Sequence, residues 1–263
     1  MRHPIVLIDA FADKPFAGNP AGVMLLDAPL PEAVMQAVAM EMAQAETAFA
    51  VARPSGGWDL RWFTPTTEIA FCGHATLATA HALAEAGQGG DLLAFHTREV
   101  GVLRVAVEGP GRYILDLPRL EPEPRDLASV LDLAPDATEA FSGGGDLVAV
   151  LPSEAAVRAY RPDLTAIAAL EGVRGVAITA RGEGTDIVSR FFGPAAGIPE
   201  DAVTGSLHAL LVPYWAARLG RDRLTAYQAS ARGGRMEARL EPTRVHLTGP
   251  AVTTLRGHID LPD

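Results

Sequence analysis

The chain contains one short phrase twice: RWFTP at residues 61–65 with CGHAT at 72–76, and RFFGP at 190–194 with TGSLH at 204–208. In each copy a strand-like arginine-aromatic-phenylalanine run precedes a loop, and a glycine then opens an apolar segment. Each segment ends at its own glycine, Gly87 or Gly220, as helices commonly do. A strand, a loop and a buried helix written twice predict a duplicated fold. The shared order of arginine, aromatic residue, phenylalanine and proline argues against chance reuse of a common unit.

Strands and helices alternate on both sides of these phrases. Pro31 at a first helical turn, followed by apolar residues on one face, predicts a helix from about Glu32 to Ala43. The turn dipeptide Gly109-Pro110 predicts that strands at 99–108 and 111–117 form a pair. Further strands are expected at 4–9, 22–26, 47–52, 60–63, 146–151, 175–180, 187–192 and 244–248, and a further helix at 162–170. The pattern indicates a mixed α/β fold.

The repeat implies two domains. A stretch rich in proline and glutamate, Pro118–Pro124, separates the copies and places the boundary near residues 1–118 and 119–263. The first domain carries Glu46 and the Gly73-His74 helix start, and the second carries Asp201 and the Gly205-Ser206 helix start. The C-terminal segment is harder to place and is able to return to the first domain. A duplicated fold most naturally holds its site in the cleft between its copies.

Composition excludes several classes of function. The 263 residues carry 22 Lys and Arg against 32 Asp and Glu, a net charge of −10, which disfavours nucleic acid as a partner. No stretch reaches 18 apolar residues, so no membrane span is expected. The N-terminal apolar run, Ile5–Ile8, is too short for a signal peptide. A single cysteine, Cys72, forbids an internal disulfide, and a cytoplasmic location is the default expectation.

Cofactor and metal sites are also not expected. Lys14 is the one lysine and lies in a polar turn, which disfavours pyridoxal-phosphate or Schiff-base chemistry. The sequence has no phosphate-binding loop of the GxxxxGK[ST] type. Its seven histidines form no HxH or HExxH pair. His74 and His81 share a helix face, but they lie two turns apart and the residues between them, Leu77 and Ala78, cannot coordinate an ion.

The two glycine-led helix starts are candidate anion sites. The first amides of a helix have no internal partner, and the helix dipole adds positive charge there. Gly73 and Gly205 therefore mark two places that suit a substrate carboxylate. The alternative is plain capping, in which Thr204 or Ser206 satisfies the helix backbone. Both interpretations stay open on these residues alone.

Three side chains are candidates for proton transfer. His74 can act as an acid, a base or a hydrogen-bond donor, although a histidine near a helix start is more often structural. Asp201, five residues before Ser206, can orient or protonate a ligand or serve as an ordinary loop carboxylate. Glu46 has apolar neighbours, which would raise the pKa of its carboxyl group and suit it to shuttle protons near neutral pH.

Cys72 allows two interpretations. A thiol beside a helix N-terminus has a lowered pKa and is able to act as a base or nucleophile. As a small apolar residue after Phe71, it is equally suited to fill space in the core.

Taken together, these motifs resemble the PhzF-like family, named for an isomerase of phenazine biosynthesis. The matching segments run in order from residue 5 to about 220: DAF at 9–11, FAGNPAGV at 16–23, AETAF at 45–49, RWFTP at 61–65, Glu68, CGHAT at 72–76, RFF at 190–192, GIPED at 197–201, TGS at 204–206 and His208. Several separated motifs in the order of the family make this resemblance specific.

The resemblance implies a diaminopimelate-epimerase-like fold, with two similar domains that each curl a mixed sheet around a central helix. It also implies a homodimer and a cofactor-independent isomerase acting on a small carboxylate-bearing metabolite. In the isomerase of that family, the residue matching Glu46 moves a proton between carbons of the substrate. The residues matching His74 and Asp201 assist this transfer. The substrate-binding positions that the resemblance implies are Asn19, Cys72, Gly73, Gly205 and Ser206.

Two departures from related patterns limit this assignment. Ala70 stands where many relatives carry an aspartate. Cys72 matches one catalytic thiol of diaminopimelate epimerase and proline racemase, but the second thiol position corresponds to Thr204, which excludes a two-thiol racemase. An epimerase that uses Cys72 with another base, and a binding protein without catalysis, remain alternatives. The natural substrate is not specified, and residues 53–59 and 141–146 are expected to shape specificity.

Overall fold

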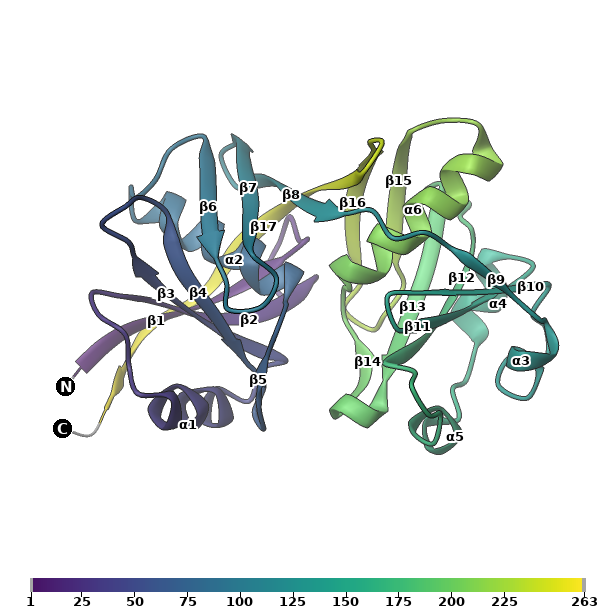
Figure 1. Ribbon diagram of the computed structural model, residues 1–263, viewed down its shortest axis with the longest axis horizontal. Helices are drawn as coiled ribbons and strands as arrows, with labels where there is room; N and C mark the ends of the chain where they lie inside the picture. Colours follow the sequence, from purple (N-terminus) through teal and green to yellow (C-terminus); the bar gives the residue numbers. More distant parts are fainter. Residues whose placement is uncertain (1, 262–263) are drawn as a thin grey trace. The chain divides into compact units, whose positions relative to one another are not determined.

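The computed structural model describes residues 2–261, and the chain folds into two compact units (Figure 1). The first comprises the residues through Asp116 and those from Thr248 onward, and the second comprises Leu117–Leu247. The C-terminal segment thus belongs to the first unit. No helix within residues 2–261 is long and apolar enough to cross a membrane.

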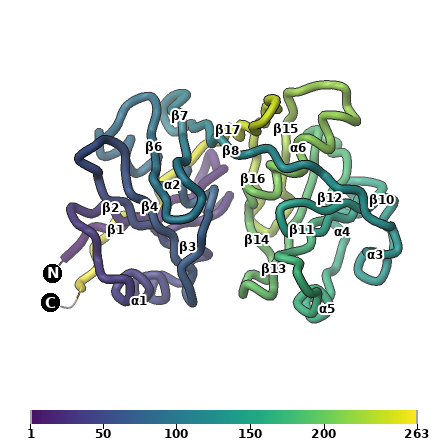
Figure 2. The backbone as a smooth tube through the Cα atoms, in the orientation of Figure 1, coloured from purple at the N-terminus to yellow at the C-terminus, as the bar shows by residue number. Residues whose placement is uncertain are grey.

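The first unit is a mixed sheet that closes on itself. Its strands are β1 (Arg2–Ala10), β2 (Asn19–Leu26), β3 (Glu46–Ala52), β4 (Trp58–Phe63), β5 (Glu68–Ile69), β6 (Leu92–His96), β7 (Val102–Gly109) and β8 (Arg112–Pro118). The long strand β17 (Arg244–Asp260) pairs with both β1 and β8 and so joins the two ends of the series. Because Arg2 lies opposite Asp260, the first and last strands of the described chain lie side by side (Figure 2).

Helix α2 (Gly73–Glu85) is the centre of this unit. It packs against β1, β2, β3 and β7, and each of its residues from Gly73 to Leu83 is buried. An alanine-rich sequence suits this position, since small side chains allow strands to approach a helix on every side. Helix α1 (Glu32–Met42) lies instead on the outer face of the sheet, where Met35, Val38 and Ala39 pack on the apolar side chains of β2 and β3.

The second unit repeats this plan. Its strands are β9 (Glu123–Arg125), β10 (Glu139–Gly143), β11 (Asp146–Val150), β12 (Gly175–Arg181), β13 (Ile187–Gly193), β14 (Ile198–Asp201), β15 (Arg223–Gln228) and β16 (Gly234–Leu240). The short helices are α3 (Ala128–Leu131), α4 (Glu154–Ala159), α5 (Leu164–Ala168) and the 3₁₀ turn Pro194–Ala196. Helix α6 (Gly205–Leu219) is the counterpart of α2, and eleven of its residues are buried.

The strand pairings show the duplication directly. In the first unit β2 and β3 are parallel, β3 and β4 antiparallel, β4 and β6 parallel, and β6 and β7 antiparallel. In the second unit β11, β12, β13, β15 and β16 follow the same sequence of parallel and antiparallel pairs. The prediction of two similar domains, each a curled sheet around a central helix, is confirmed.

The repeated arginines hold corresponding loops in place. Arg61 on β4 forms two hydrogen bonds with Glu68 on β5, both 2.6 Å long. Arg190 on β13 binds Glu200 on β14 in the same way, at 2.7 and 3.0 Å. Each guanidinium also lies 5.0 Å from the ring of the phenylalanine two residues later. A bidentate pair of this kind fixes distance and orientation together, and here it fixes the segment that leads into each central helix.

Several elements differ from the sequence-based predictions. The predicted helix at 162–170 is shorter and begins at Leu164, because the Asp163 side chain accepts a hydrogen bond from the Ala166 amide and caps it there. Strands β5, β6, β9, β10, β14, β15 and β16 were not predicted. In β15 and β16 the buried positions alternate with arginine, glutamate and other exposed residues, and one buried position in each strand is an alanine, which weakens the apolar signal. The predicted specificity segments are hairpin connections, between β3 and β4 and between β10 and β11.

The turn between β1 and β2 delivers Asn19 to the interior. The buried Asp9 carboxylate accepts a hydrogen bond of 2.7 Å from the Phe16 amide. Phe11 and Phe16 have positive φ angles of 58° and 70°, which is uncommon for bulky residues. Gly18 has a φ of 63°, and a Cβ atom added to it would lie 2.1 Å from the Ala10 carbonyl oxygen. This turn therefore requires glycine at position 18.

We expect Gly18→Ala to destabilise the protein far more than Gly87→Ala. The two glycines have similar φ angles, +63° and +67°, but a Cβ at Gly87 would meet nothing within 4 Å. Gly87→Ala should cost about 1–2 kcal/mol from backbone strain alone. Gly18→Ala adds a backbone clash and should cost about 2 kcal/mol more. Urea unfolding of both variants tests this, and equal losses would contradict the proposed close packing of the turn.

Candidate active site

The first candidate site lies where α2 begins. Cys72 is extended, with φ −145° and ψ 110°, and makes no capping hydrogen bond to α2 within residues 2–261. His74 follows in the first turn of the helix. The helix is enclosed by the sheet, so Cys72 and His74 are buried with only 5% and 4% of their surfaces exposed. The beginning of α2 thus presents a thiol and an imidazole to the protein interior.

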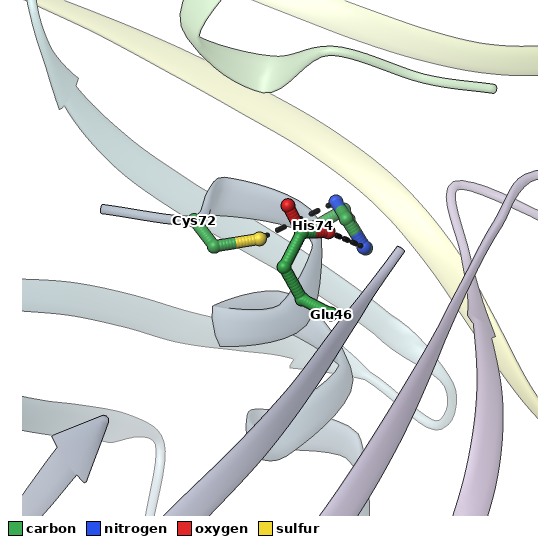
Figure 3. Close-up of side chains that lie close together, drawn as sticks. All are labelled: Glu46, Cys72 and His74. Atoms are coloured by element: carbon green, nitrogen blue, oxygen red, sulfur yellow. Dashed lines mark hydrogen bonds and ion pairs between the residues drawn. The ribbon is translucent and has the colours of Figure 1, made fainter. Parts of the chain in front are cut away.

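Glu46 reaches the same place from a different element. It is the first residue of β3, opposite Ala21 of β2, and it is 6% exposed. Its Oε2 atom lies 3.2 Å from Nε2 of His74 (Figure 3). The Cys72 sulfur lies 3.5 Å from Nδ1 of the same ring. The structure therefore brings together Glu46, Cys72 and His74, which the sequence analysis selected separately.

Asn19 completes this group from the first position of β2. Its side-chain Nδ2 lies 3.1 Å from Nδ1 of His74. An amide nitrogen can only donate, so Nδ1 accepts and the imidazole proton resides on Nε2. This proton is then on the ring nitrogen that lies 3.2 Å from the Glu46 carboxylate, although the two atoms do not have hydrogen-bond geometry. Asn19 therefore sets the tautomer of His74 beside Glu46.

Burial keeps this imidazole neutral. Burial lowers the pKa of His74 from 6.5 to about 3, and a hydrogen bond with the Pro20 backbone raises it only in part. The contact of 3.2 Å between His74 and Glu46 is therefore not an ion pair at neutral pH, and it does not have the geometry of a hydrogen bond. A neutral imidazole N–H can stabilise negative charge without itself exchanging a proton.

The second unit carries a corresponding polar group where α6 begins. Asp201 ends β14, and its Oδ2 accepts a hydrogen bond of 2.6 Å from the Thr204 hydroxyl. The Thr204 amide donates to Oε1 of Gln228 at 2.8 Å, and Nε2 of Gln228 donates to the Asp201 carbonyl at 2.8 Å. The Thr204 hydroxyl is thus bonded to Asp201, and in the described chain the Thr204 side chain makes no capping hydrogen bond to α6. The simple capping interpretation of Thr204 is wrong.

Gln228 is a positioning residue that the sequence analysis missed. Its side chain is completely buried on β15 and holds both Asp201 and Thr204. No local motif marks it, because it lies more than twenty residues further along the chain than its partners. Glu200, the neighbour of Asp201, is directed elsewhere and pairs with Arg190. The side chains of the two adjacent acids therefore have different partners.

Ser206, in the first turn of α6, is held by a second missed residue. Arg174 donates to the Ser206 hydroxyl through Nη2 at 3.0 Å. The guanidinium is fixed in turn by Asp146, to whose two oxygens it donates at 2.9 and 2.5 Å. Asp146 is 2% exposed, and burial raises the pKa of its carboxyl group while Arg174 acts in the opposite direction. Asp146 belongs to the segment 141–146 that was expected to shape specificity.

His208 anchors the first turn of α6 from inside. Its Nδ1 lies 2.8 Å from the Thr204 carbonyl oxygen, which can only accept, so Nδ1 carries the proton. Its Nε2 lies 3.5 Å from the Ser189 hydroxyl. Burial lowers the pKa of His208 to about 4, with the Thr204 backbone acting in the opposite direction. His208 is therefore a neutral structural histidine at physiological pH.

Three comparisons show which known proteins the chain is similar to. Residues 8–257 match the profile of the family described as phenazine biosynthesis-like protein. A protein of Pseudomonas aeruginosa named as an uncharacterised isomerase is 48% identical over 259 residues, which covers 97% of each chain. The crystal structure of a PhzF-family phenazine biosynthesis protein from Enterococcus faecalis superimposes with a TM-score of 0.94 at 42% identity, covering 99% of this chain and 100% of that one.

A more distant structure shows the fold alone. A hydroxyproline epimerase from Agrobacterium vitis, solved with bound trans-4-hydroxy-L-proline, superimposes with a TM-score of 0.66 at 11% identity. The match covers 100% of this chain and 93% of the epimerase. It agrees with the predicted epimerase-like fold.

We expect His208 to make stability depend on pH between about 4 and 6.5. In this window the unfolded chain binds a proton at His208 and the folded chain does not, so stability falls as the pH falls. The loss per histidine is about 1.4 kcal/mol per pH unit. Urea unfolding of His208→Gln between pH 4.5 and 6.5 should show a slope smaller by about this amount. The exposed control His258→Gln should keep the wild-type slope, and an unchanged slope in His208→Gln would contradict the assignment.

Proposed function

The chain belongs to the phenazine biosynthesis-like protein family and is an isomerase, and we propose that Glu46 moves a proton on its carboxylate substrate. The observation that carries this proposal is the contact of 3.2 Å between Glu46 and a buried, neutral His74. A carboxylate in an enclosed site, beside an imidazole that does not itself titrate near neutrality, is suited to general acid–base catalysis.

In the proposed reaction the Glu46 carboxylate removes a proton from an acidic carbon of the substrate. The resulting carboxylic acid returns that proton to a different carbon, which completes the isomerisation and regenerates the carboxylate. Because Glu46 returns the proton that it removes, the reaction needs no cofactor and consumes or releases no net proton. Positioned proton transfer of this kind contributes roughly 10²–10⁴-fold in rate.

His74 and the beginning of α2 would stabilise the charge between these two steps. Removal of a proton from carbon leaves negative charge on the substrate, and the neutral Nε2–H of His74 is able to donate to it. The amides of the first helical turn, including that of Gly73, add partial positive charge in a region that excludes water. The role of Asn19 in this proposal is to keep the His74 proton on Nε2.

The beginning of α6 in the second unit carries groups suited to bind a carboxylate. The Ser206 hydroxyl and the first amides of α6, beginning at Gly205, suit the carboxylate group of the substrate, and Arg174 adds a guanidinium beside Ser206. Asp201, fixed through Thr204 and Gln228, would orient the substrate or supply a proton. The cytoplasmic location and the homodimer stay predictions from sequence.

An epimerase that uses Cys72 is the second candidate. The sulfur lies 3.5 Å from Nδ1 of His74, close enough for that ring to accept the thiol proton. With Thr204 at the other thiol position, such an enzyme would need a different second base. Glu46 would then be the partner of Cys72, and both side chains would be required for exchange.

Deuterium exchange separates these functions. We expect the wild type, incubated in D₂O with a panel of small amino, hydroxy and cyclic unsaturated carboxylates, to incorporate deuterium into at least one of them. Glu46→Gln should lower that rate about 10²–10⁴-fold, because the amide cannot accept a proton. NMR of the recovered compounds measures the incorporation, and the exposed control Glu41→Gln should keep the wild-type rate.

The Cys72→Ala variant decides between the two mechanisms. The proposal predicts that it exchanges deuterium much faster than Glu46→Gln. Equal loss in Cys72→Ala and Glu46→Gln would favour the thiol epimerase, and loss in Cys72→Ala alone would exclude Glu46 as the proton-transfer residue. Saturable ligand binding without any exchange would instead indicate a binding protein.

A further inference from the structure

Cys72 is a buried nucleophile that the proposed mechanism leaves without a chemical task. Its sulfur, one carboxylate oxygen of Glu46 and one ring nitrogen of His74 all lie within 4.8 Å of one another (Figure 3). We propose that these three side chains form a binding site for a thiophilic divalent cation of the zinc class, and that occupancy of this site inhibits the isomerase.

Each of the two closest pairs of donor atoms has a separation typical of ligands on a tetrahedral zinc ion. Zinc bonds of roughly 2.0 Å to nitrogen and oxygen and 2.3 Å to sulfur place a nitrogen and a sulfur ligand about 3.5 Å apart, and a nitrogen and an oxygen ligand about 3.3 Å apart. The Cys72 sulfur lies 3.5 Å from Nδ1 of His74. The Glu46 oxygen lies 3.2 Å from Nε2 of the same ring. These two contacts involve opposite nitrogens of the ring, so a single ion would use one nitrogen and the side chain beside the other nitrogen would move to complete the site. One donor atom from each residue already lies within 4.8 Å of the other two.

The kinds of donor select the class of cation. Thiolate, imidazole and carboxylate together are typical of zinc sites with three protein ligands and one open position. Magnesium and calcium prefer six or more oxygen ligands, and this group offers a single carboxylate. A copper or cobalt ion shares the preference for sulfur and nitrogen and would compete for the same site.

Charge balance also favours a divalent ion here. All three side chains are buried, and an isolated charge in such a place is costly. A divalent cation bound by the Glu46 carboxylate and the Cys72 thiolate forms a neutral group, with the thiol proton released to solvent. His74 is already in the neutral form that coordinates a metal. The occupied site therefore carries no net charge.

The inhibitory consequence rests on the proposed function. A carboxylate that coordinates a metal cannot remove a proton from substrate, so the ion would take away the group on which turnover depends. Coordination through either His74 nitrogen would also replace one of its present contacts, with Asn19 at Nδ1 or with Glu46 at Nε2. Binding of the ion and isomerase turnover should therefore exclude each other.

Titration of the full chain with Co²⁺ tests the site without reference to activity. We expect one equivalent to give the charge-transfer absorption of a thiolate–cobalt bond, and Zn²⁺ to displace it. Cys72→Ala should abolish the absorption and weaken Zn²⁺ binding at least about 100-fold in competition with a chromophoric chelator. His74→Ala should weaken binding comparably, and the exposed control His258→Ala should bind as the wild type does.

Two results would overturn the proposal. Absence of the thiolate–cobalt absorption at saturating Co²⁺, with thermal unfolding showing that the protein is folded, would exclude the site. Equal Zn²⁺ affinity in the wild type and in Cys72→Ala would show that the ion binds elsewhere. A positive titration without deuterium exchange would support the metal site and count against the isomerase mechanism. Exchange that continues at full rate with the site occupied would refute the inhibition.

Discussion

Enclosure of a helix by a curled sheet is the constraint on which the rest of this structure depends. Every side chain of α2 from Gly73 to Leu83 is buried, so each polar group on that helix needs a partner inside the protein. Thr76 and Thr79 donate to carbonyl oxygens one turn earlier, and His81 contacts the Tyr113 hydroxyl. At the beginning of the helix, where backbone amides have no partner in the helix itself, Cys72 and His74 instead lie beside Glu46.

The same enclosure sets the character of both buried histidines. Burial removes the water that would stabilise an imidazolium, so His74 and His208 stay neutral far below the usual pH of histidine titration. Their neighbours then fix the proton on one nitrogen. In His74 this proton is on the nitrogen facing Glu46, and in His208 it is used to hold the Thr204 carbonyl. Two histidines in duplicated elements thus have different tasks, one beside a candidate base and one purely structural.

The sequence was enough to predict the duplication, the two central helices and the members of the first site, because each has a local signal. RWFTP and RFFGP mark strands, glycines mark both ends of each helix, and Glu46 and His74 lie in short motifs. Gln228 and Arg174 could not be predicted in this way. Their tasks arise from strand pairing and from contacts across more than twenty residues, which no spacing in the chain encodes. The proposed metal-binding group was not predicted for the same reason, since Glu46 comes from β3 and the other two residues from the start of α2.

The central claim is that one carboxylate both removes and returns the proton. A substrate deuterated at its acidic carbon, turned over once by the wild type in ordinary water, tests this most directly. A single-base mechanism at a buried Glu46 predicts that part of the label reappears at the new carbon of the product. It also predicts that this fraction rises as turnover outpaces exchange of the Glu46 proton with solvent. Complete replacement of the label by solvent hydrogen under every condition would contradict the account and indicate two separate groups for removal and delivery.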